Sequence, residues 1–422
     1  MNRSLYSIAL YLISPLLLVY LAVRAFKSPD YRGRWSERFG LKKLTQTDIL
    51  VHSVSMGETL AAVPLIKQLQ QLYPELSITI TTTSPTGSAE VKKAFADTVQ
   101  HCYLPFDLAW CARRFVKQVA PKYSIIMETE LWPNLIHYLK KADAKVLLAN
   151  ARLSEKSANS YQKNHKLTQP MLQQLDIIAA QSVQAAERFI ALGVAPERVS
   201  VCGSLKFDIN IDQQRIDAAT LLRQQWHAQE RPVWVAGSVH PGEFDALITA
   251  HKQLLGQYPK VLMVMVPRHP EQFDNAAEAI QNAGLVVARR SQQTAVSTET
   301  QVVLGDTMGE LLTFYGAADQ AFVGGSLIVH GGHNPLEPAA MGLPVMMGPN
   351  YRDFIEISEL LQSAGGLTVV DNADALATNL IALFANSAAY EQASIAAKSV
   401  VAQNRGSLAK QLAVVESMIE NR

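Results

Sequence analysis

The sequence predicts an α/β protein made of two Rossmann-like halves, with a membrane-spanning helix near the start of the chain. Three observations support this prediction. The chain has 422 residues, which is long for a single hydrophobic core. Short apolar runs alternate with helix-like segments in two successive series, as in parallel sheets built from βαβ units. The uncharged stretch LYSIALYLISPLLLVYLAV, residues 5–23, is just long enough to cross a bilayer core of about 30 Å as a helix.

The amino-acid composition narrows the classes of function. The formal net charge is +1, so the chain lacks the basic excess typical of nucleic-acid-binding proteins, and we expect no nucleic-acid partner. The three cysteines, Cys102, Cys111 and Cys202, fit no zinc or CxxC spacing, and their odd number argues against a disulfide framework. A reducing compartment is the simplest interpretation.

The apolar N-terminal stretch has two interpretations, a membrane anchor and a cleaved signal peptide. The anchor is favoured because the run is longer than a typical signal-peptide core and no small-x-small cleavage site follows it. Only Arg3 and the amino terminus precede the run with positive charge, so the positive-inside rule places the body of the protein in the cytoplasm. We expect the basic residues that follow, here called the basic collar, to contact anionic headgroups at about 1 kcal/mol each. The collar comprises Arg24, Lys27, Arg32, Arg34, Arg38, Lys42 and Lys43.

The remaining elements follow in two series. In the first, strands are expected within residues 48–55, 76–84, 123–130, 144–151 and 175–182, with helices over 59–72 and from 85. Residues 198–212 end this series. In the second, strands are expected within residues 231–243, 260–271, 300–310, 320–326 and 343–350, and the chain from 374 onward is expected to be helical. The predicted parts are an anchor over 1–25, a first half over 26–208, and a second half over 209–422 that includes the terminal helices.

Ligands of open α/β sheets bind at the carboxyl ends of the strands, and the second half has a glycine-rich segment at such an end. In GGSLIVHGGHNPLEP, residues 324–338, a helix is expected to start near Asn334 as N-cap, with Pro335 in the first turn and Glu337 completing a capping box. A well-capped helix would explain this pattern by itself. The glycines also allow close backbone approach, and a free helix N-terminus can face a phosphate.

Two other strand ends in the second half carry candidate ligand contacts. Arg268 directly follows a buried strand and could clamp a phosphate, although a surface arginine fits equally well. The turn GDTMGEL offers the backbone N–H groups of Met308 and Gly309. His330 and His333 form an HxxH pair, but the sequence offers no third ligand at metal spacing, so we predict no metal site.

In the first half, carboxylates and a lysine occupy comparable places. Glu58 opens the helix after the first strand, next to Gly57, while Glu128 and Glu130 end a later strand and Lys206 lies near the junction of the halves. The helix dipole should lower the pKa of Glu58 and keep it ionised, as for a structural cap. Because a general base must be ionised before it acts, the same position suits deprotonation of an acceptor hydroxyl.

The segments HSVSMGET, METELWPN, NARLSEKS, GSLKFD, PRHPE and GGHNPLEPAA together resemble, in the same order, the Kdo transferases of lipopolysaccharide synthesis. The resemblance implies the GT-B fold, in which two Rossmann-like domains face a cleft. It implies transfer of 3-deoxy-D-manno-octulosonic acid (Kdo) from CMP-Kdo to the primary hydroxyl of a lipid A precursor, lipid IVA. The transfer is expected to invert the anomeric centre without a metal or other cofactor, at the cytoplasmic face of the inner membrane.

The resemblance also implies roles for individual residues. Glu58 matches the catalytic base, and Glu128 and Lys206 match groups that assist the transition state. The acceptor would bind to the first half and CMP-Kdo to the second. The segments expected to contact CMP are Pro267 and Arg268, then Met308, Gly309 and Glu310, then Asn334, Pro335, Leu336 and Glu337. Two alternatives stay open, a GT-B enzyme that uses a UDP-sugar on another lipid, and an anchored protein that binds a nucleotide sugar without turnover.

Overall fold

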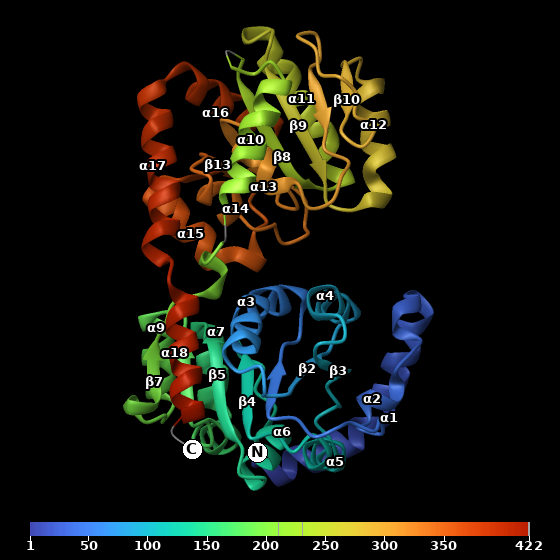
Figure 1. Ribbon diagram of the computed structural model, residues 1–422, viewed down its shortest axis with the longest axis vertical. Coiled ribbons are helices and arrows are strands. Elements are labelled where there is room, and N and C mark those ends of the chain that lie inside the picture. The colour runs from blue at the N-terminus through green and yellow to red at the C-terminus, as the bar shows by residue number, and fades with distance from the viewer. Residues whose placement is uncertain (210, 230, 421–422) are drawn as a thin grey trace. The chain divides into compact units, whose positions relative to one another are not determined.

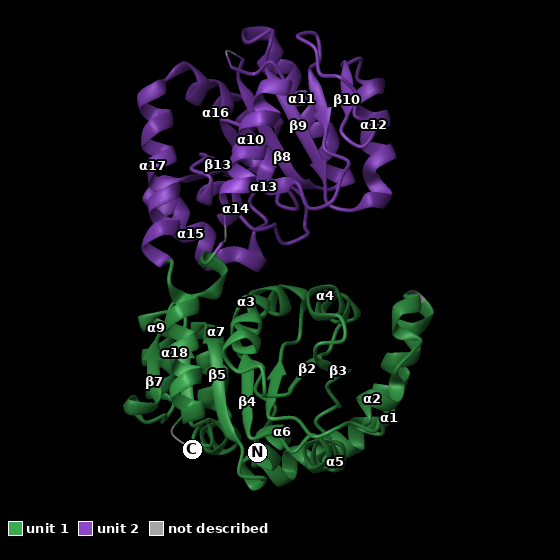
Figure 2. Ribbon diagram, viewed as in Figure 1, with its two compact units in different colours: residues 1–208, 405–422 green, residues 209–404 purple. Residues whose placement is uncertain are grey.

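The computed structural model describes residues 1–209, 211–229 and 231–420 and divides the chain into two compact units (Figure 2). Unit 1 consists of Met1–Asp208 with Arg405–Arg422, and unit 2 of Ile209–Asn404. Each unit is built on a seven-stranded parallel sheet with helices packed against it (Figure 1). The predicted class, α/β with two parallel sheets, is confirmed.

The sheet of unit 1 has the strand order β3-β2-β1-β4-β5-β6-β7, so the order reverses between β1 and β4. Its central strands are buried on both faces, which explains their continuous Ile, Leu and Val runs. The strands are β1 (Ile49–His52), β2 (Ile78–Thr82), β3 (Gln100–Tyr103), β4 (Tyr123–Met127), β5 (Lys145–Ala151), β6 (Ile177–Ala180) and β7 (Val199–Val201). The helices are α1 (Arg3–Lys27), α2 (Trp35–Arg38), α3 (Met56–Leu72), α4 (Pro85–Phe95), α5 (Ala109–Val119), α6 (Pro133–Lys141), α7 (Glu155–Lys163), α8 (His165–Leu172), α9 (Val183–Ala191) and α18 (Ser407–Glu420), with short 3-10 turns η1 (Pro29–Tyr31), η2 (Pro196–Arg198) and η3 (Leu205–Phe207).

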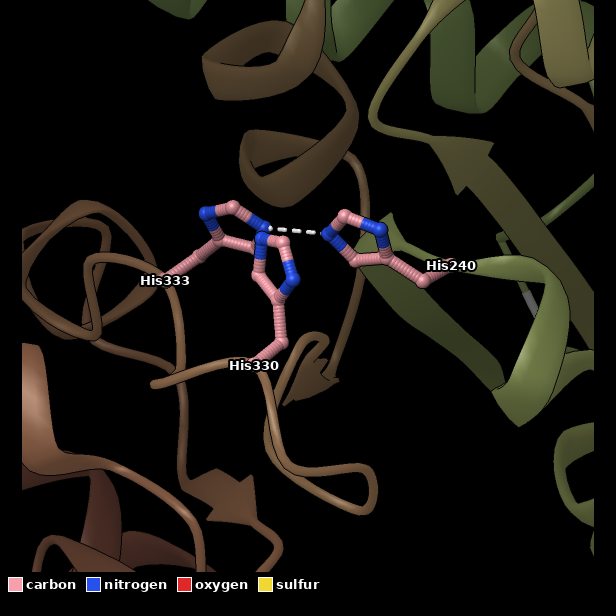
Figure 3. Close-up of side chains that lie close together, drawn as sticks. All are labelled: His240, His330 and His333. Carbon is pink, nitrogen blue, oxygen red and sulfur yellow. Dashed lines mark hydrogen bonds between the residues drawn. The ribbon is translucent and has the colours of Figure 1, made fainter. Parts of the chain in front are cut away.

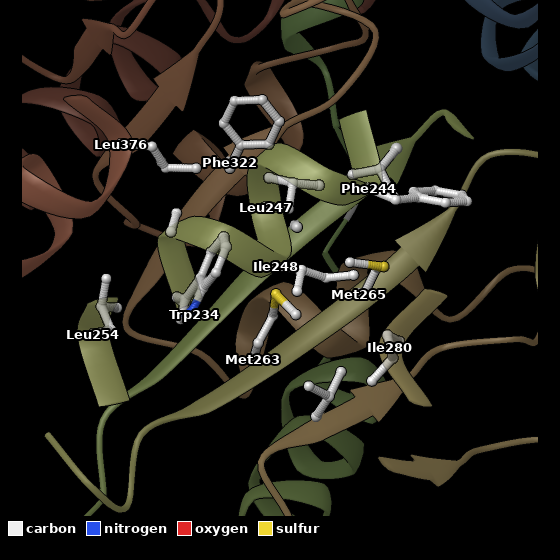
Figure 4. Close-up of a cluster of buried hydrophobic side chains, with 14 of the residues drawn as sticks. Trp234, Phe244, Leu247, Ile248, Leu254, Met263, Met265, Ile280, Phe322 and Leu376 are labelled. Atoms are coloured by element: carbon white, nitrogen blue, oxygen red, sulfur yellow. The ribbon is translucent and has the colours of Figure 1, made fainter. Parts of the chain in front are cut away.

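The sheet of unit 2 has the order β10-β11-β9-β8-β12-β13-β14, and it reverses between β8 and β12. Trp234 of β8 and Phe322 of β12 belong to a buried cluster that also contains Leu247 and Leu254 of α11 (Figure 4). The strands are β8 (Val233–Val239), β9 (Leu262–Pro267), β10 (Val287–Arg289), β11 (Val302–Leu304), β12 (Gln320–Val323), β13 (Val345–Met347) and β14 (Leu367–Val369). The helices are α10 (Gln213–Gln225), α11 (Phe244–Gln257), α12 (Phe273–Asn282), α13 (Leu311–Gly316), α14 (Leu336–Ala340), α15 (Ile355–Ala364), α16 (Ala373–Ala385) and α17 (Ser387–Asn404), with turns η4 (Pro241–Glu243), η5 (Pro270–Gln272) and η6 (Arg352–Phe354).

The final helix, α18, belongs to unit 1, so the expectation that all C-terminal helices belong to the second half was wrong for this one. Val415 and Met418 of α18 are buried in the core shared with α3 and β5. The Gln411 carboxamide accepts a hydrogen bond from the Asn150 amide at 2.8 Å and donates to the Gly203 carbonyl at 3.1 Å. The chain therefore returns to unit 1 because α18 has an apolar face that this unit buries.

The basic collar is partly used inside unit 1, contrary to the expectation that all of it faces headgroups. Arg34 and Lys42 both form ion pairs with the buried Glu37, at 2.8 and 3.1 Å. Arg38 is buried, and its guanidinium lies 4.2 Å from the ring centroid of Tyr103. Arg24, Arg32 and Lys43 stay exposed.

One described helix, Arg3–Phe26 within α1, is long and apolar enough to cross a membrane, judged by length and composition alone.

Candidate active site

The candidate site in unit 1 lies at the carboxyl ends of β1 and β4, where the strand order reverses. This is the place where open α/β sheets bind ligands. After β1, Ser55 caps α3, which begins at Met56, three residues earlier than the sequence predicted. The Glu58 carboxylate folds back onto this turn and accepts hydrogen bonds from the Val54 amide at 2.7 Å and the Ser55 hydroxyl at 2.8 Å. The capping box therefore fixes the Glu58 side chain at the end of β1.

The pKa of Glu58 is raised above its ordinary value, so the expected lowering by the helix dipole was wrong. Burial is the largest cause, and the charge of Glu128 raises the pKa further. The hydrogen bonds from Val54 and Ser55 act in the opposite direction and are outweighed. Glu58 is thus a carboxylate that holds a proton more readily than an exposed glutamate does.

Glu128 and Lys206 lie together, as their predicted shared role requires. The Lys206 ammonium is 3.5 Å from the Glu128 carboxylate, and both side chains are largely shielded from solvent. Glu128 follows β4 with a left-handed backbone (φ 53°), and its amide donates to the Ala149 carbonyl at 2.9 Å. Such a conformation is uncommon for a residue with a side chain and is often found at functional sites.

Glu130 is the third carboxyl group at this end of the sheet, and no role was predicted for it from the sequence. Its pKa is raised to about 7, first by burial and then by the charges of Glu58 and Glu128. The charges of Glu58 and Glu128 thus add to the effect of burial, and Glu130 titrates near neutral pH.

The candidate site in unit 2 gathers around the reversal between β8 and β12. Arg268 directly follows β9, and its amide donates to the Val239 carbonyl at the end of β8 at 3.0 Å. Burial is the largest cause of the lowered pKa of His333 and of His240, and the positive charge of Arg268 lowers both further. Arg268 is thus electrically coupled to residues of the glycine-rich segment, as the sequence predicted for two strand ends that meet at one site.

A buried glutamate that the sequence analysis missed holds the glycine-rich loop in place. Glu243, in the turn after β8, is 0% exposed. Its carboxylate accepts hydrogen bonds from the amides of Gly325, Ser326 and Leu327, at 2.8, 3.0 and 3.1 Å, and from the His240 amide at 3.0 Å. These loop amides are therefore satisfied by Glu243, and a ligand phosphate must be held by other groups.

Helix α14 begins at Leu336 with Pro335 as its N-cap, so the prediction of Asn334 as N-cap was wrong. The Asn334 side chain still accepts from the Leu336 amide at 3.1 Å. Burial raises the pKa of Glu337, while Arg268, Arg215 and a hydrogen bond with Asn334 lower it. Asn334, Glu337 and Arg268 thus form one polar group beside the loop.

Three histidines meet at this edge of unit 2, as Figure 3 shows. The ring nitrogens of His240 and His333 are 2.9 Å apart, and His330 completes a group whose ligand atoms lie within 4.8 Å of one another. The prediction that the HxxH pair lacks a third ligand at metal spacing was therefore wrong, because the fold brings His240 next to His330 and His333. Burial lowers the pKa of His240 to about 4 and of His333 to about 3, and the charged neighbours that contribute are Arg268 and other imidazoles, including His269. Both imidazoles are therefore neutral at neutral pH, and Arg268 is a positively charged group beside them.

The turn that contains Met308 and Gly309 is the third predicted CMP-contacting segment. Met308 is exposed, and Gly309 has the left-handed backbone (φ 88°) that suits glycine. The Glu310 carboxylate is occupied by Arg290, at 2.7 Å, and by the Thr307 hydroxyl. Strand β11, which leads into this turn, pairs with β9, which leads to Arg268. Among the described residues, however, no hydrogen bond joins Glu310 to Arg268.

Comparison with known proteins decides the family. Residues 33–209 match the family described as 3-deoxy-D-manno-octulosonic-acid transferase (kdotransferase). The 3-deoxy-D-manno-octulosonic acid transferase of Haemophilus influenzae is 42% identical over 425 residues, which cover 100% of this chain and 99% of that protein. The chain belongs to this family. It is a Kdo transferase of lipopolysaccharide synthesis, and the predicted enzyme class is confirmed.

Two further similarities agree with this assignment. The transferase of Bordetella pertussis is 32% identical over 99% of this chain and 100% of that protein. A solved structure of a glycosyltransferase from Rickettsia africae matches this structure with a TM-score of 0.55 and 15% sequence identity. The match covers 90% of this chain and 99% of the Rickettsia chain. At this identity the likeness concerns the fold alone, and it agrees with the predicted GT-B class.

The residues that sequence reasoning missed are those whose partners are distant along the chain. Glu243 meets its loop 82 residues later, and His240 meets His333 across 93 residues. The sequence did contain a signal, because HPGE follows a strand in the same way that HSVSMGE does. Applying the strand-end rule to β8 as well would have included both residues.

Proposed function

We propose that this Kdo transferase moves Kdo from CMP-Kdo to the primary hydroxyl of a lipid A precursor, lipid IVA, with inversion and with Glu58 as general base. The observation that carries the proposal is the placement of Glu58, which the capping box fixes at the sheet reversal among two further carboxyl groups. Its raised pKa makes it a stronger base than an exposed glutamate, provided that it is ionised when the acceptor binds.

In the proposed step, the acceptor hydroxyl gives its proton to Glu58 while its oxygen attacks the anomeric carbon of Kdo. The bond from that carbon to the phosphate oxygen of CMP breaks, and CMP leaves with the electron pair. A single displacement of this kind inverts the anomeric centre. A Cβ at Gly57 would have only the Ser55 hydroxyl oxygen nearby, at 3.9 Å, so the glycine leaves open space beside the base for a bulky acceptor.

The remaining unit 1 residues are assigned to charge stabilisation. The anomeric carbon gains positive charge as the bond to CMP breaks, and the Glu128 carboxylate can stabilise it. Lys206, 3.5 Å from Glu128, can offset negative charge on the leaving group. Burial and the charges of Glu58 and Glu128 raise the pKa of Glu130 to about 7, so Glu130 can hold or pass a proton beside Glu58.

In unit 2 we propose the donor site. Arg268 provides the positive charge that the phosphate of CMP-Kdo requires, and the imidazoles of His240 and His333, which are neutral at neutral pH, can form hydrogen bonds beside it. The segments Pro267–Arg268, Met308–Gly309–Glu310 and Asn334–Pro335–Leu336–Glu337 are the proposed CMP contacts, and Glu337 can accept from a ribose hydroxyl. The chain is proposed to act on the cytoplasmic face of the inner membrane, held there by α1.

The test is the variant Glu58→Gln, which keeps the size of the side chain and removes the base. We expect turnover to fall by about 10²- to 10⁴-fold, the usual contribution of general base catalysis, with CMP affinity unchanged. Glu155→Gln, at an exposed helix start, is the matched control and should retain full turnover. Wild-type turnover by Glu58→Gln would exclude Glu58 as the base, and inhibition by UDP instead of CMP would favour the UDP-sugar alternative.

A further inference from the structure

Polar side chains at the N-terminal end of helix α1 form hydrogen bonds with the body of unit 1. The Tyr6 hydroxyl donates to the Asp107 carboxylate at 3.1 Å, and Arg3 and Ser7 both donate to the Asn134 side-chain oxygen, at 3.1 and 3.0 Å. Figure 1 shows the dark-blue start of α1 beside α6. The first two turns of the helix are therefore attached to the globular body.

The attachment point is a rigid part of unit 1. The Asp107 carboxylate accepts hydrogen bonds from the amides of Asn134 and Leu135, at 2.9 and 2.8 Å, and so caps the start of α6. The Asn134 amide group donates to the Asp107 carbonyl at 2.7 Å, and both residues are buried. One turn further on, the Tyr11 hydroxyl accepts from the Trp110 amide at the start of α5, at 2.9 Å.

The other end of α1 packs against the turn that directly follows it, η1. Leu21 is only 1% exposed, the Arg32 guanidinium donates to the Ala25 carbonyl at 3.0 Å, and Arg24 lies 5.5 Å from the ring centroid of Tyr31. The less exposed side chains include one every three or four residues from one end of the helix to the other, namely Arg3, Ser7, Leu10, Ser14, Leu17, Leu21 and Ala25. Tyr6 and Ala9 are half-buried as well.

The rest of the surface of α1 is apolar and exposed along the whole helix. Its most exposed apolar side chains include Leu12 and Phe26, at 77% and 88%, and the others in this group are Leu5, Ile8, Leu16 and Val19. Five more large apolar side chains, Tyr11, Ile13, Leu18, Tyr20 and Val23, are exposed to a smaller extent. An apolar stripe of this length on a single helix marks a surface that water does not cover in the working protein.

A transmembrane arrangement conflicts with these contacts. The 25 residues of α1 extend about 37 Å as a helix, which exceeds the bilayer core of about 30 Å. If α1 crossed the bilayer, Arg3 and Tyr6 would lie on the side opposite to Asp107 and Asn134. The hydrogen bonds of Arg3, Tyr6 and Ser7 hold only if the N-terminal end of the helix stays on the same side of the membrane as unit 1.

We infer that α1 lies in the plane of the membrane, with its apolar face in the leaflet on the side of the catalytic body, instead of spanning the bilayer. This inference refines the membrane attachment in the proposed function and replaces the single span expected from the sequence. The partner it fits is a bilayer surface that contains anionic lipids. Apolar side chains on one face of an in-plane helix enter the headgroup and acyl boundary to about 5–10 Å.

Helix α5, joined to α1 through Trp110, supplies the matching charge. Its exposed side chains are Trp110, Arg113, Arg114 and Lys117, and Arg114 lies 5.7 Å from the Trp110 ring centroid. Tryptophan is enriched at membrane interfaces, and each basic side chain near an anionic surface contributes about 1 kcal/mol. The basic residues that contact headgroups are therefore partly those of α5, instead of the whole basic collar.

The test uses the full chain in membrane vesicles with single cysteines at Ser4 and Lys93. Both positions are exposed, Ser4 in the first turn of α1 and Lys93 in α4 of unit 1, and the native cysteines are buried. A membrane-impermeant maleimide should label Ser4→Cys and Lys93→Cys in the same vesicle orientation. Labelling of Ser4→Cys only from the opposite side would overturn the inference.

A depth measurement decides the matter if Ser4→Cys reacts from neither side. Spin labels at Leu5→Cys, Leu12→Cys and Phe26→Cys, in vesicles of phosphatidylethanolamine and phosphatidylglycerol, should all report a similar shallow depth. A spanning helix would instead place Leu12 deep and the other two near opposite surfaces, which would contradict the inference. Neither the labelling nor the depth measurement involves sugar transfer. Failure of this inference can therefore be distinguished from failure of the proposed function.

Discussion

Glu130→Gln is expected to stabilise unit 1 in a pH-dependent way. The pKa of Glu130 is about 7 in the folded chain, against an ordinary value of 4.5, because of burial and of Glu58 and Glu128. Folded Glu130 therefore binds a proton more tightly than unfolded Glu130, and stability falls as the pH rises from about 4.5 to about 7. The difference of about 2.5 units corresponds to about 3 kcal/mol above pH 7, and glutamine, which does not ionise, avoids this loss.

The assay is thermal unfolding of the detergent-solubilised full chain at pH 5 and pH 8. For a unit of about 200 residues, 1 kcal/mol shifts Tm by roughly 2–4 °C. We therefore expect Glu130→Gln to raise the Tm of the unit 1 transition by roughly 6–12 °C at pH 8 and by much less at pH 5. Glu155→Gln, at an exposed position, should give no such pH dependence. An equal shift at both pH values, or a larger shift at pH 5, would refute the reasoning.

Two further predictions concern unit 2. Glu243→Gln replaces the charged acceptor of four backbone amides, so the glycine-rich loop should lose order. We expect the affinity for CMP, measured by calorimetric titration, to fall about 10- to 100-fold. The control variant Glu278→Gln, at an exposed position of α12, should bind CMP normally. Unchanged affinity in Glu243→Gln would show that the loop does not depend on this carboxylate. A Cβ at Gly237 would lie 2.1 Å from the hydroxyl oxygen of the buried Tyr315, so Gly237→Ala should destabilise by about 1–3 kcal/mol in thermal unfolding. Gly256→Ala, in open space within α11, should instead stabilise by roughly 0.5–1 kcal/mol, and equal effects of the two alanines would contradict this packing argument.

The sequence predicted those parts of the site that follow from one strand end at a time. Glu58 after β1, Glu128 after β4 and Arg268 after β9 are placed by the chain within a few residues of a buried strand. The alternation of apolar runs with helices was also sufficient for the two parallel sheets. Local pattern and the strand-end rule account for these successes.

The parts that the sequence did not predict depend on contacts between distant segments. The direction of the Glu58 pKa shift follows from burial, which the dipole argument ignored. The role of Glu243 depends on a loop 82 residues away, and α18 returns to unit 1 through side chains such as Gln411. Short edge strands such as β3, β10 and β14, with three or four residues each, carry too little pattern to be recognised.

The attachment of α1 illustrates the same limit at the membrane. Length and hydropathy predict a span, and they do so for any sufficiently long apolar helix. Tyr6 and Ser7 look unremarkable within that stretch until their partners, Asp107 and Asn134, are known. The difference between a helix that spans and one that lies in the membrane plane is thus a tertiary property.

The central claim is that this chain transfers Kdo from CMP-Kdo to a lipid A precursor. The most direct test incubates the detergent-solubilised full chain with CMP-Kdo and tetraacyl lipid A precursor and measures product masses by mass spectrometry. We predict a mass gain of one or more Kdo units with release of CMP, and none with the Glu58→Gln variant. An absence of mass gain from folded protein that binds CMP would contradict the assignment of this acceptor.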